Sequence, residues 1–87
     1  MNITQAPHGI SVVVETDSAV YIGRLGKLHG DRVNMHHAAV IPVTAGQSVE
    51  AEIRHAAKFG VAVEHVELLF ETRGIQRVRK LGEVPKA

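Results

Sequence analysis

Six histidines in a chain of 87 residues are the side chains that most directly suggest metal chemistry. His36 and His37 are neighbours, and because successive side chains of a strand point to opposite faces, we do not expect them to bind one ion. His29 and His36 could converge across a turn, but no third ligand follows at a spacing typical of a metal site. We therefore expect no metal site. We expect histidines at the surface, where protonation near neutral pH would make any affinity for phosphate depend on pH.

The sequence also lacks the residue patterns that carry catalysis. It contains no cysteine, which excludes thiol nucleophiles, disulfide bonds and cysteine-ligated zinc. Neither the Gly-x-Ser-x-Gly pattern of a serine nucleophile nor the Gly-x-x-x-x-Gly-Lys loop of a nucleotide site is present. Gly23, Gly26 and Gly30 are closely spaced, but their spacing matches neither nucleotide-binding fingerprint. We expect that the protein is not an enzyme and has no cofactor.

The charged residues are distributed unevenly, although the formal net charge is only +1. The stretch 50–71 is rich in acids, whereas five cations and a single acid, Glu83, lie between residue 73 and the end. Two interpretations remain open: these cations cover a solvated strand face, or they contact phosphate groups. The five cations are Arg73, Arg77, Arg79, Lys80 and Lys86.

The elements that must position these residues are predicted mainly as β-strands. Val, Ile, Leu and Ala supply most of the apolar content, and branched side chains favour a pleated sheet. A single domain of this length has a thin core and often gains stability by oligomerisation. Apolar runs and turn residues predict strands near residues 10–14 and at 19–27, 32–41, 63–70 and 75–81, with a loose N-terminal arm at 1–8 and a C-terminal tail at 82–87.

One helix is predicted at residues 48–59, between the third and fourth strands. Ser48 is a suitable N-cap, and Glu50 lies near the positive end of the helix dipole. Ile53 and Ala56 belong to a narrow apolar stripe at helical spacing. We therefore expect the helix to dock on the sheet through that stripe.

Three segments of the chain resemble the motifs of a known family. In residues 10–25 a hydrophobic strand and a turn precede an aromatic and the pattern x-Gly-x-Leu, whose Gly23 fits strong sheet curvature. Residues 31–34 read Asp-Arg-Val-Asn, and in residues 68–78 a hydrophobic run leads through an Arg-Gly turn into a spaced apolar strand. This order resembles the Sm-like (LSm) family. The resemblance implies a strongly bent five-stranded antiparallel barrel, here with the helix inserted between strands 3 and 4.

The resemblance also implies a function. The fourth strand of one copy would join the fifth strand of the next, so that a homo-oligomeric ring closes without a bare strand edge. Single-stranded RNA would bind at loops that line the pore, through the charge of an arginine and the carboxamide of an asparagine, while arginines on the strands, Arg24 among them, add phosphate contacts. The RNA-binding residues implied in this way are Asp31, Asn34, Arg73, Gly74, Arg77 and Arg79.

A second function stays open beside RNA binding. No aromatic residue occupies the loop position on which that family stacks a base, which favours a protein-interaction or structural assembly module of the same fold with no nucleic-acid partner. Asn34 could be an ordinary turn or strand residue, since Asn readily bonds its own backbone, and Arg73-Gly74 suits any tight turn. The sequence shows no leader and no apolar run of about 18–20 residues, so we expect no membrane partner and a cytoplasmic location.

Overall fold

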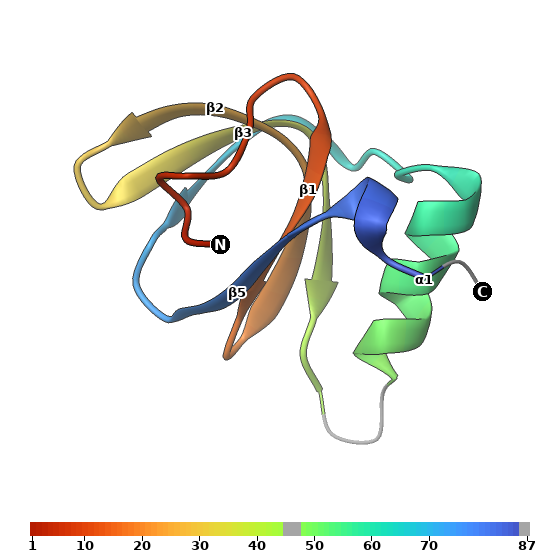
Figure 1. Ribbon diagram of the computed structural model, residues 1–87. Helices are drawn as coiled ribbons and strands as arrows, with labels where there is room; N and C mark the ends of the chain where they lie inside the picture. The colour runs from red at the N-terminus through yellow and green to blue at the C-terminus, as the bar shows by residue number, and fades with distance from the viewer. Residues whose placement is uncertain (45–47, 86–87) are drawn as a thin grey trace.

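The computed structural model describes residues 1–44 and 48–85, and within them one antiparallel sheet of five strands is accompanied by one helix (Figure 1). The expectation of a mainly β fold is therefore confirmed. Residues 86–87 of the predicted tail, with the cation Lys86, lie outside the described part. The elements are β1 (Ser11–Thr16), β2 (Ala19–His29), β3 (Arg32–Pro42), α1 (Val49–Phe59), β4 (His65–Glu71), β5 (Ile75–Lys80) and a short 3₁₀ turn, η1 (Leu81–Glu83).

The strands lie side by side in the order β4, β3, β2, β1, β5. The first two connections are tight turns, and tight turns place consecutive antiparallel strands next to each other. Between β1 and β2 the Thr16 side chain organises the turn, because its hydroxyl donates to the Ala19 carbonyl at 2.7 Å and accepts from the Ala19 N–H at 3.0 Å. The β1–β2–β3 part of the sheet is thus built from local contacts.

The turn between β4 and β5 joins the two outermost strands of the sheet, which stay unpaired with each other in the described chain and leave the sheet open. β4 pairs with β3 and β5 pairs with β1, so within the described residues β4 and β5 do not pair with each other. Thr72 donates through its N–H and its hydroxyl to the Asp31 carbonyl, whereas Gly74 faces the Asp17 carboxylate at the β1–β2 turn. Because the turn extends between these two places, it separates the strands that it joins. The barrel expected from the resemblance is therefore not closed.

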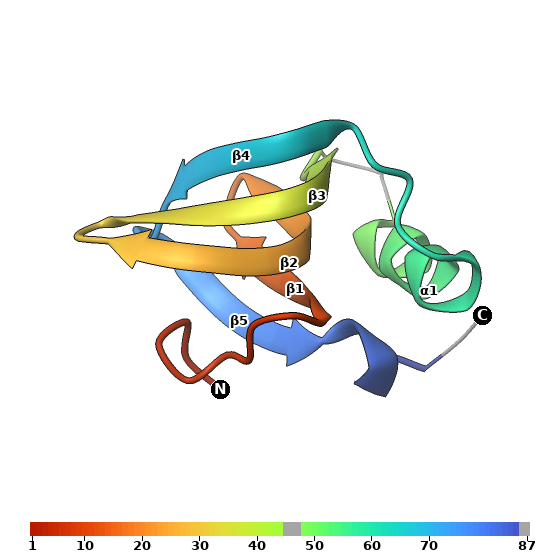
Figure 2. The same cartoon turned by 90° about the horizontal axis from the view of Figure 1, so that it is seen from above.

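Two hydrophobic clusters lie on opposite faces of the sheet. The first is on the inner face, where Tyr21 of β2 and Phe70 of β4 stack with ring centroids 4.0 Å apart, although β3 lies between their strands. Such a contact needs a curved sheet, and Figure 2 shows the strands curving around this cluster. The second cluster lies on the outer face and is covered by α1 and η1. The inner cluster comprises Ala6, Val12, Val14, Leu25, Val33, Met35, Ala38, Phe70 and Val78, and the outer one comprises Val13, Val20, Ile22, Ile41, Ile53, Leu81 and Val84.

Gly23 makes the curvature of β2 and β3 possible. A Cβ atom at this position would lie 2.9 Å from the His36 carbonyl oxygen and 2.9 Å from Met35 Cγ, which is closer than a side chain can approach. The backbone of β2 therefore packs directly on β3. A glycine inside a strand often marks a place where another backbone approaches closely, and here that backbone is β3.

The helix docks on one end of the outer face (Figure 2). Ser48 caps its N-terminus by accepting from the Ala51 N–H at 3.3 Å, and the Gly60 N–H donates to the Ala56 carbonyl at its C-terminus. Ile53 is completely buried against the outer cluster. The cap and the apolar stripe together explain why the helix forms where it does.

The N-terminal segment runs beside β5 in Figure 2 and packs against the inner cluster. Asn2 organises it, because its side-chain oxygen accepts from the N–H groups of Thr4 and Gln5. Ala6 is only 5% exposed, and Ile3 packs on the same cluster. Among the described residues, no helix is long and apolar enough to cross a bilayer.

Candidate functional site

β4 is an edge strand that carries exposed apolar side chains. Val66 faces the inner side of the sheet and is 72% exposed, and Leu69 faces the outer side and is 51% exposed. β4 has a neighbour on one side only, so its second backbone edge is unpaired in the described chain. A strand with exposed apolar side chains on both faces and an unpaired edge is a template for another strand.

The edge of β5 is polar and basic. Its outer face carries Arg77 and Arg79, which lie opposite Glu15 and Val13 of β1. The same face of β4 carries two acids, Glu67 and Glu71. The two free edges of the sheet therefore have opposite charge on the same face.

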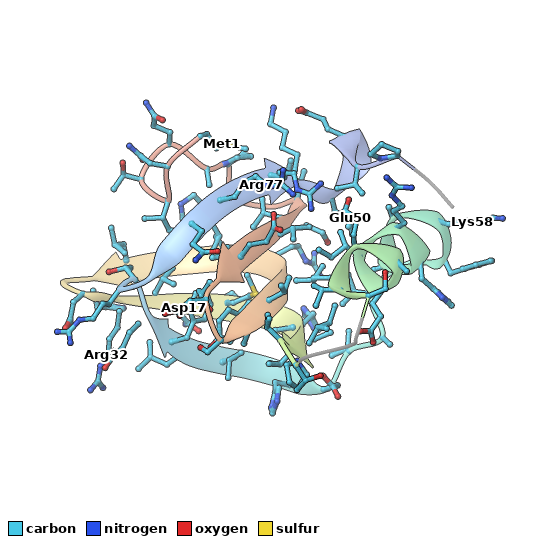
Figure 3. All side chains as sticks on the ribbon, turned by 90° about the horizontal axis from the view of Figure 1, so that it is seen from below. Met1, Asp17, Arg32, Glu50, Lys58 and Arg77 are labelled. Atoms are coloured by element: carbon cyan, nitrogen blue, oxygen red, sulfur yellow. The ribbon has the colours of Figure 1, made fainter. Side chains whose placement is uncertain are left out.

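Arg77 and Arg79 also belong to an ion-pair cluster with two glutamates. Arg77 Nε donates to Glu15 at 2.7 Å, and Arg79 Nε donates to the same carboxylate at 3.1 Å. Arg79 also bonds both carboxylate oxygens of Glu50, at 3.0 and 3.3 Å, and Figure 3 shows Glu50 on α1 close to Arg77 on β5. Arg54 of α1 completes the cluster, 3.7 Å from Glu50. The cluster links β1, β5 and the first turn of α1.

The pKa values follow from these contacts. The hydrogen bond from Arg79 lowers the pKa of Glu50 most, burial opposes it as the second-largest effect, and the charges of Arg79, Arg54 and Arg77 lower the pKa further. The hydrogen bond to Glu15 raises the pKa of Arg77, and the Glu15 charge adds to this effect. Both groups are therefore held more firmly in their charged forms, and the two arginines implied as RNA contacts share their charge with carboxylates of the same chain.

Three of the implied RNA contacts meet at one end of the sheet. The hydrogen bonds from Thr72 to the Asp31 carbonyl join the β2–β3 turn to the β4–β5 turn. Arg73 and Gly74 lie in that second turn, and Arg73 is exposed. Gly74 has φ +81°, which a side chain would strain. We call this group, Asp31, Arg73 and Gly74, the loop end; it lies away from α1 (Figure 2).

Asn34 lies inside β3, and its side chain is already engaged. Its Nδ2 donates to Glu67 Oε1 on β4 at 3.1 Å. Its Oδ1 is buried and, within the described chain, has no hydrogen-bond partner. A base contact would therefore have to displace Glu67 from Nδ2 or reach the buried Oδ1.

β3 contains a bulge that no local residue pattern marks. His37 has φ +52°, and the register of β2 and β3 shifts between Ile22 and Arg24, so that two β3 residues lie opposite Gly23. Arg24 Nη2 lies 3.1 Å from His37 Nδ1, and Arg24 is also the cross-strand partner of His36. The two histidines therefore both lie beside Arg24, and the expectation that they point to opposite faces is wrong because the bulge breaks the alternation of β3.

No group of three His, Cys, Asp or Glu residues in the described chain could hold a metal ion. Comparison with other proteins adds no family to this description. No protein-family model, no curated protein and no solved structure matches the chain. Any functional conclusion must therefore come from the geometry of the chain itself.

Proposed function

We propose that the protein is a self-assembling subunit of Sm-like type, in which β4 of one copy pairs with β5 of the next to close a homo-oligomeric ring. The observation that carries the proposal is the pair of edge strands, neither of which has a second strand neighbour in the described chain: β4 exposes Val66 and Leu69 on opposite faces, and β5 is rich in arginine. Pairing would cover both apolar side chains and satisfy the backbone groups of both edges. A contact between two different surfaces of identical copies forms a ring when its rotation closes.

Charge supports the pairing of β4 with β5 of a neighbouring copy. A sheet that continues from one copy to the next keeps each face continuous, so Glu67 and Glu71 would share a face with Arg77 and Arg79 of the neighbour. Opposite charges across a pair of strands stabilise the pairing, and like charges at the same positions would oppose it. The same pattern disfavours β4 meeting β4, because both would bring acids to the interface.

The test is the mass of the assembly, measured by native mass spectrometry and light scattering on the whole chain. Val66→Lys should reduce the assembly to monomers without lowering the unfolding temperature of the monomer, because Val66 contributes little to its own core. Phe59→Lys is the matched control, since Phe59 of α1 is 69% exposed and lies off both edges. A wild-type protein that stays monomeric at micromolar concentration would refute the proposal.

RNA binding at the loop end is a second candidate function. The observation in its favour is that the Asp31–Thr72 hydrogen bonds fix exposed Arg73 beside a neighbouring turn, so that a ring would repeat its charge around one opening. Arg77 and Arg79 contribute less, because they pair with Glu15 and Glu50, and the cluster of three arginines and two glutamates keeps only one net positive charge. A salt-dependent titration with single-stranded oligonucleotides tests this function. Arg73→Ala should weaken binding several-fold and Arg54→Ala should not, and equal affinities of the two variants would reject it.

A further inference from the structure

Three nitrogen-bearing side chains gather on the outer face of the two strands at the middle of the sheet. Arg24 of β2 and His36 of β3 are cross-strand partners, and Arg24 Nη2 lies 3.1 Å from His37 Nδ1. Arg24 and His37 are exposed, whereas His36 is half-buried. This arrangement is separate from the loop end and is not part of either free strand edge.

The bulge is what keeps both imidazoles outside. Met35 and Ala38 are three positions apart and are both buried in the inner cluster, so an extra residue must lie between them. In a regular strand one of the two histidines would take an inward position. His37 instead adopts a left-handed conformation, which few residues other than glycine tolerate without strain. Histidine takes this conformation more readily than most residues, and such backbone conformations cluster at functional sites.

Gly26 of β2 makes room for the second imidazole. A Cβ atom at this position would lie 2.7 Å from His36 Nε2, which means that the ring of His36 rests against the bare backbone of β2. Glycine therefore holds His36 close to the strand that carries Arg24. The bulge at His37 in β3 and the glycine at position 26 of β2 thus both help to bring Arg24, His36 and His37 together.

The hydrogen-bond roles of the group are fixed by chemistry. A guanidinium has only donors, so Arg24 donates and His37 Nδ1 accepts. A neutral His37 must then carry its proton on Nε2, where it is a donor. One acid, Glu67, is the β4 partner of His36, and its carboxylate accepts a hydrogen bond from Asn34. The group therefore offers several donors with one full positive charge.

We propose that Arg24, His36 and His37 form a binding site for a phosphate group. The site goes beyond the proposed assembly and does not depend on it, since all three residues belong to one copy. Arg24 supplies charged donors and His37 supplies one at Nε2, with His36 beside them, and bonds from a charged guanidinium to phosphate are among the stronger ones in proteins. The phosphate could be a free phosphorylated compound or a nucleic-acid backbone, because both present the same oxygens.

The test is an NMR titration of the whole protein that follows the imidazole signals of His36 and His37. Inorganic phosphate, acetate and a short single-stranded oligonucleotide serve as probes in separate arms. We expect phosphate to shift both imidazole signals saturably and acetate to bind at least several-fold more weakly. If the oligonucleotide competes with phosphate the source is a nucleic-acid backbone, and if it does not the source is a free phosphorylated compound.

His37→Gly is the decisive variant. Glycine accepts the left-handed conformation, so the variant should keep the bulge and unfold at no lower temperature, while phosphate affinity falls about tenfold. Arg24→Gln should weaken binding by at least as much, and Lys58→Gln, which removes one exposed cation from α1, should leave it unchanged. Unshifted imidazole signals in tens of millimolar phosphate, or equal affinity of His37→Gly and the wild type, would overturn the site.

Discussion

At the scale of single residues, the charges where β1, β5 and α1 meet are paired inside the molecule. Arg79 illustrates this best, because it bonds both Glu15 and Glu50 and so joins the sheet to the helix. A sequence shows that cations accumulate after residue 73, but it does not show which acids from distant segments will meet them. Glu15 and Arg79 are brought together by β1–β5 pairing, which is set by the topology of the whole sheet.

Glu50 provides a prediction at this scale. Its pKa is lower in the folded chain than its ordinary value of 4.5, so it stabilises the fold above that pH, and the contribution is lost as pH falls through the lowered pKa. Glu50→Gln should therefore reduce the loss of stability between neutral pH and about pH 3. Because the Glu50 side chain is 41% exposed, we expect an effect of less than about 1 kcal/mol.

Urea unfolding at several pH values measures this effect. Arg79→Gln should reduce the same pH dependence, because it removes the hydrogen bond that lowers the pKa of Glu50. If Glu50→Gln loses stability on acidification as steeply as the wild type, the ion pair does not contribute in solution.

At the scale of elements, only a few side chains on the inner face of β4 pack against the rest of the sheet. Phe70 is 7% exposed and stacks on Tyr21, while most of β4 is open to solvent. Phe70→Ala should destabilise the fold by about 3–4 kcal/mol, through lost burial and an inner cavity. Phe59→Ala, at the exposed end of α1, should change stability by about 0.5 kcal/mol or less. Denaturant unfolding of both variants compares them directly, and similar losses would show that the stack does not hold β4.

Gly23 gives a second prediction for the elements. Gly23→Ala should destabilise the sheet by about 1–3 kcal/mol, because the new Cβ would meet the His36 carbonyl, which is backbone and cannot rotate away. Gly82→Ala is the control, since a Cβ at Gly82 has no neighbour within 4 Å. Thermal unfolding distinguishes the two, and a Gly23→Ala protein as stable as the control would mean that the strands can separate locally at no cost.

The elements were largely predictable, and the irregularities within them were not. Alternating branched residues indicate strands, and Ser48 with an apolar stripe indicates a helix, because these signals are local. The β3 bulge has no such signal, since His37 is not glycine and nothing beside it in the sequence marks a left-handed residue. The end of β2 also extended past the predicted residue 27 to His29, where pairing with Arg32 outweighs the turn tendency of the segment.

The candidate site was predictable only in part. The Arg73-Gly74 turn and Asp31 lie together at the loop end, as their places after β4 and β2 would suggest. Asn34 was expected beside them, but in the structure it bonds Glu67, because it is the third residue of β3 and faces β4. The grouping of Arg24 with His36 and His37 depends on strand register, which the sequence does not specify near glycine-rich segments.

At the scale of the whole molecule, the two edge strands differ in charge, and this would make the proposed assembly sensitive to salt. Raising ionic strength from about 0.05 to 0.5 M shortens the Debye length from roughly 14 to 4 Å. We therefore expect the concentration needed for half-assembly to rise several-fold, since Glu67 and Glu71 would attract Arg77 and Arg79 of the neighbour less strongly. Light scattering over a concentration series at both salt levels measures this, and tighter association at high salt would mean that apolar contact alone joins the copies.

The turn at residues 72–74 has a consequence for the size of such an assembly. It is fastened at Asp31 on one side and lies against Asp17 on the other, so it fixes the angle between the strand that offers one edge and the strand that offers the other. Each added copy repeats that angle. A small change in this angle would alter the rotation from each copy to the next. That rotation would decide how many copies close a ring, or whether the copies form an open helical filament instead.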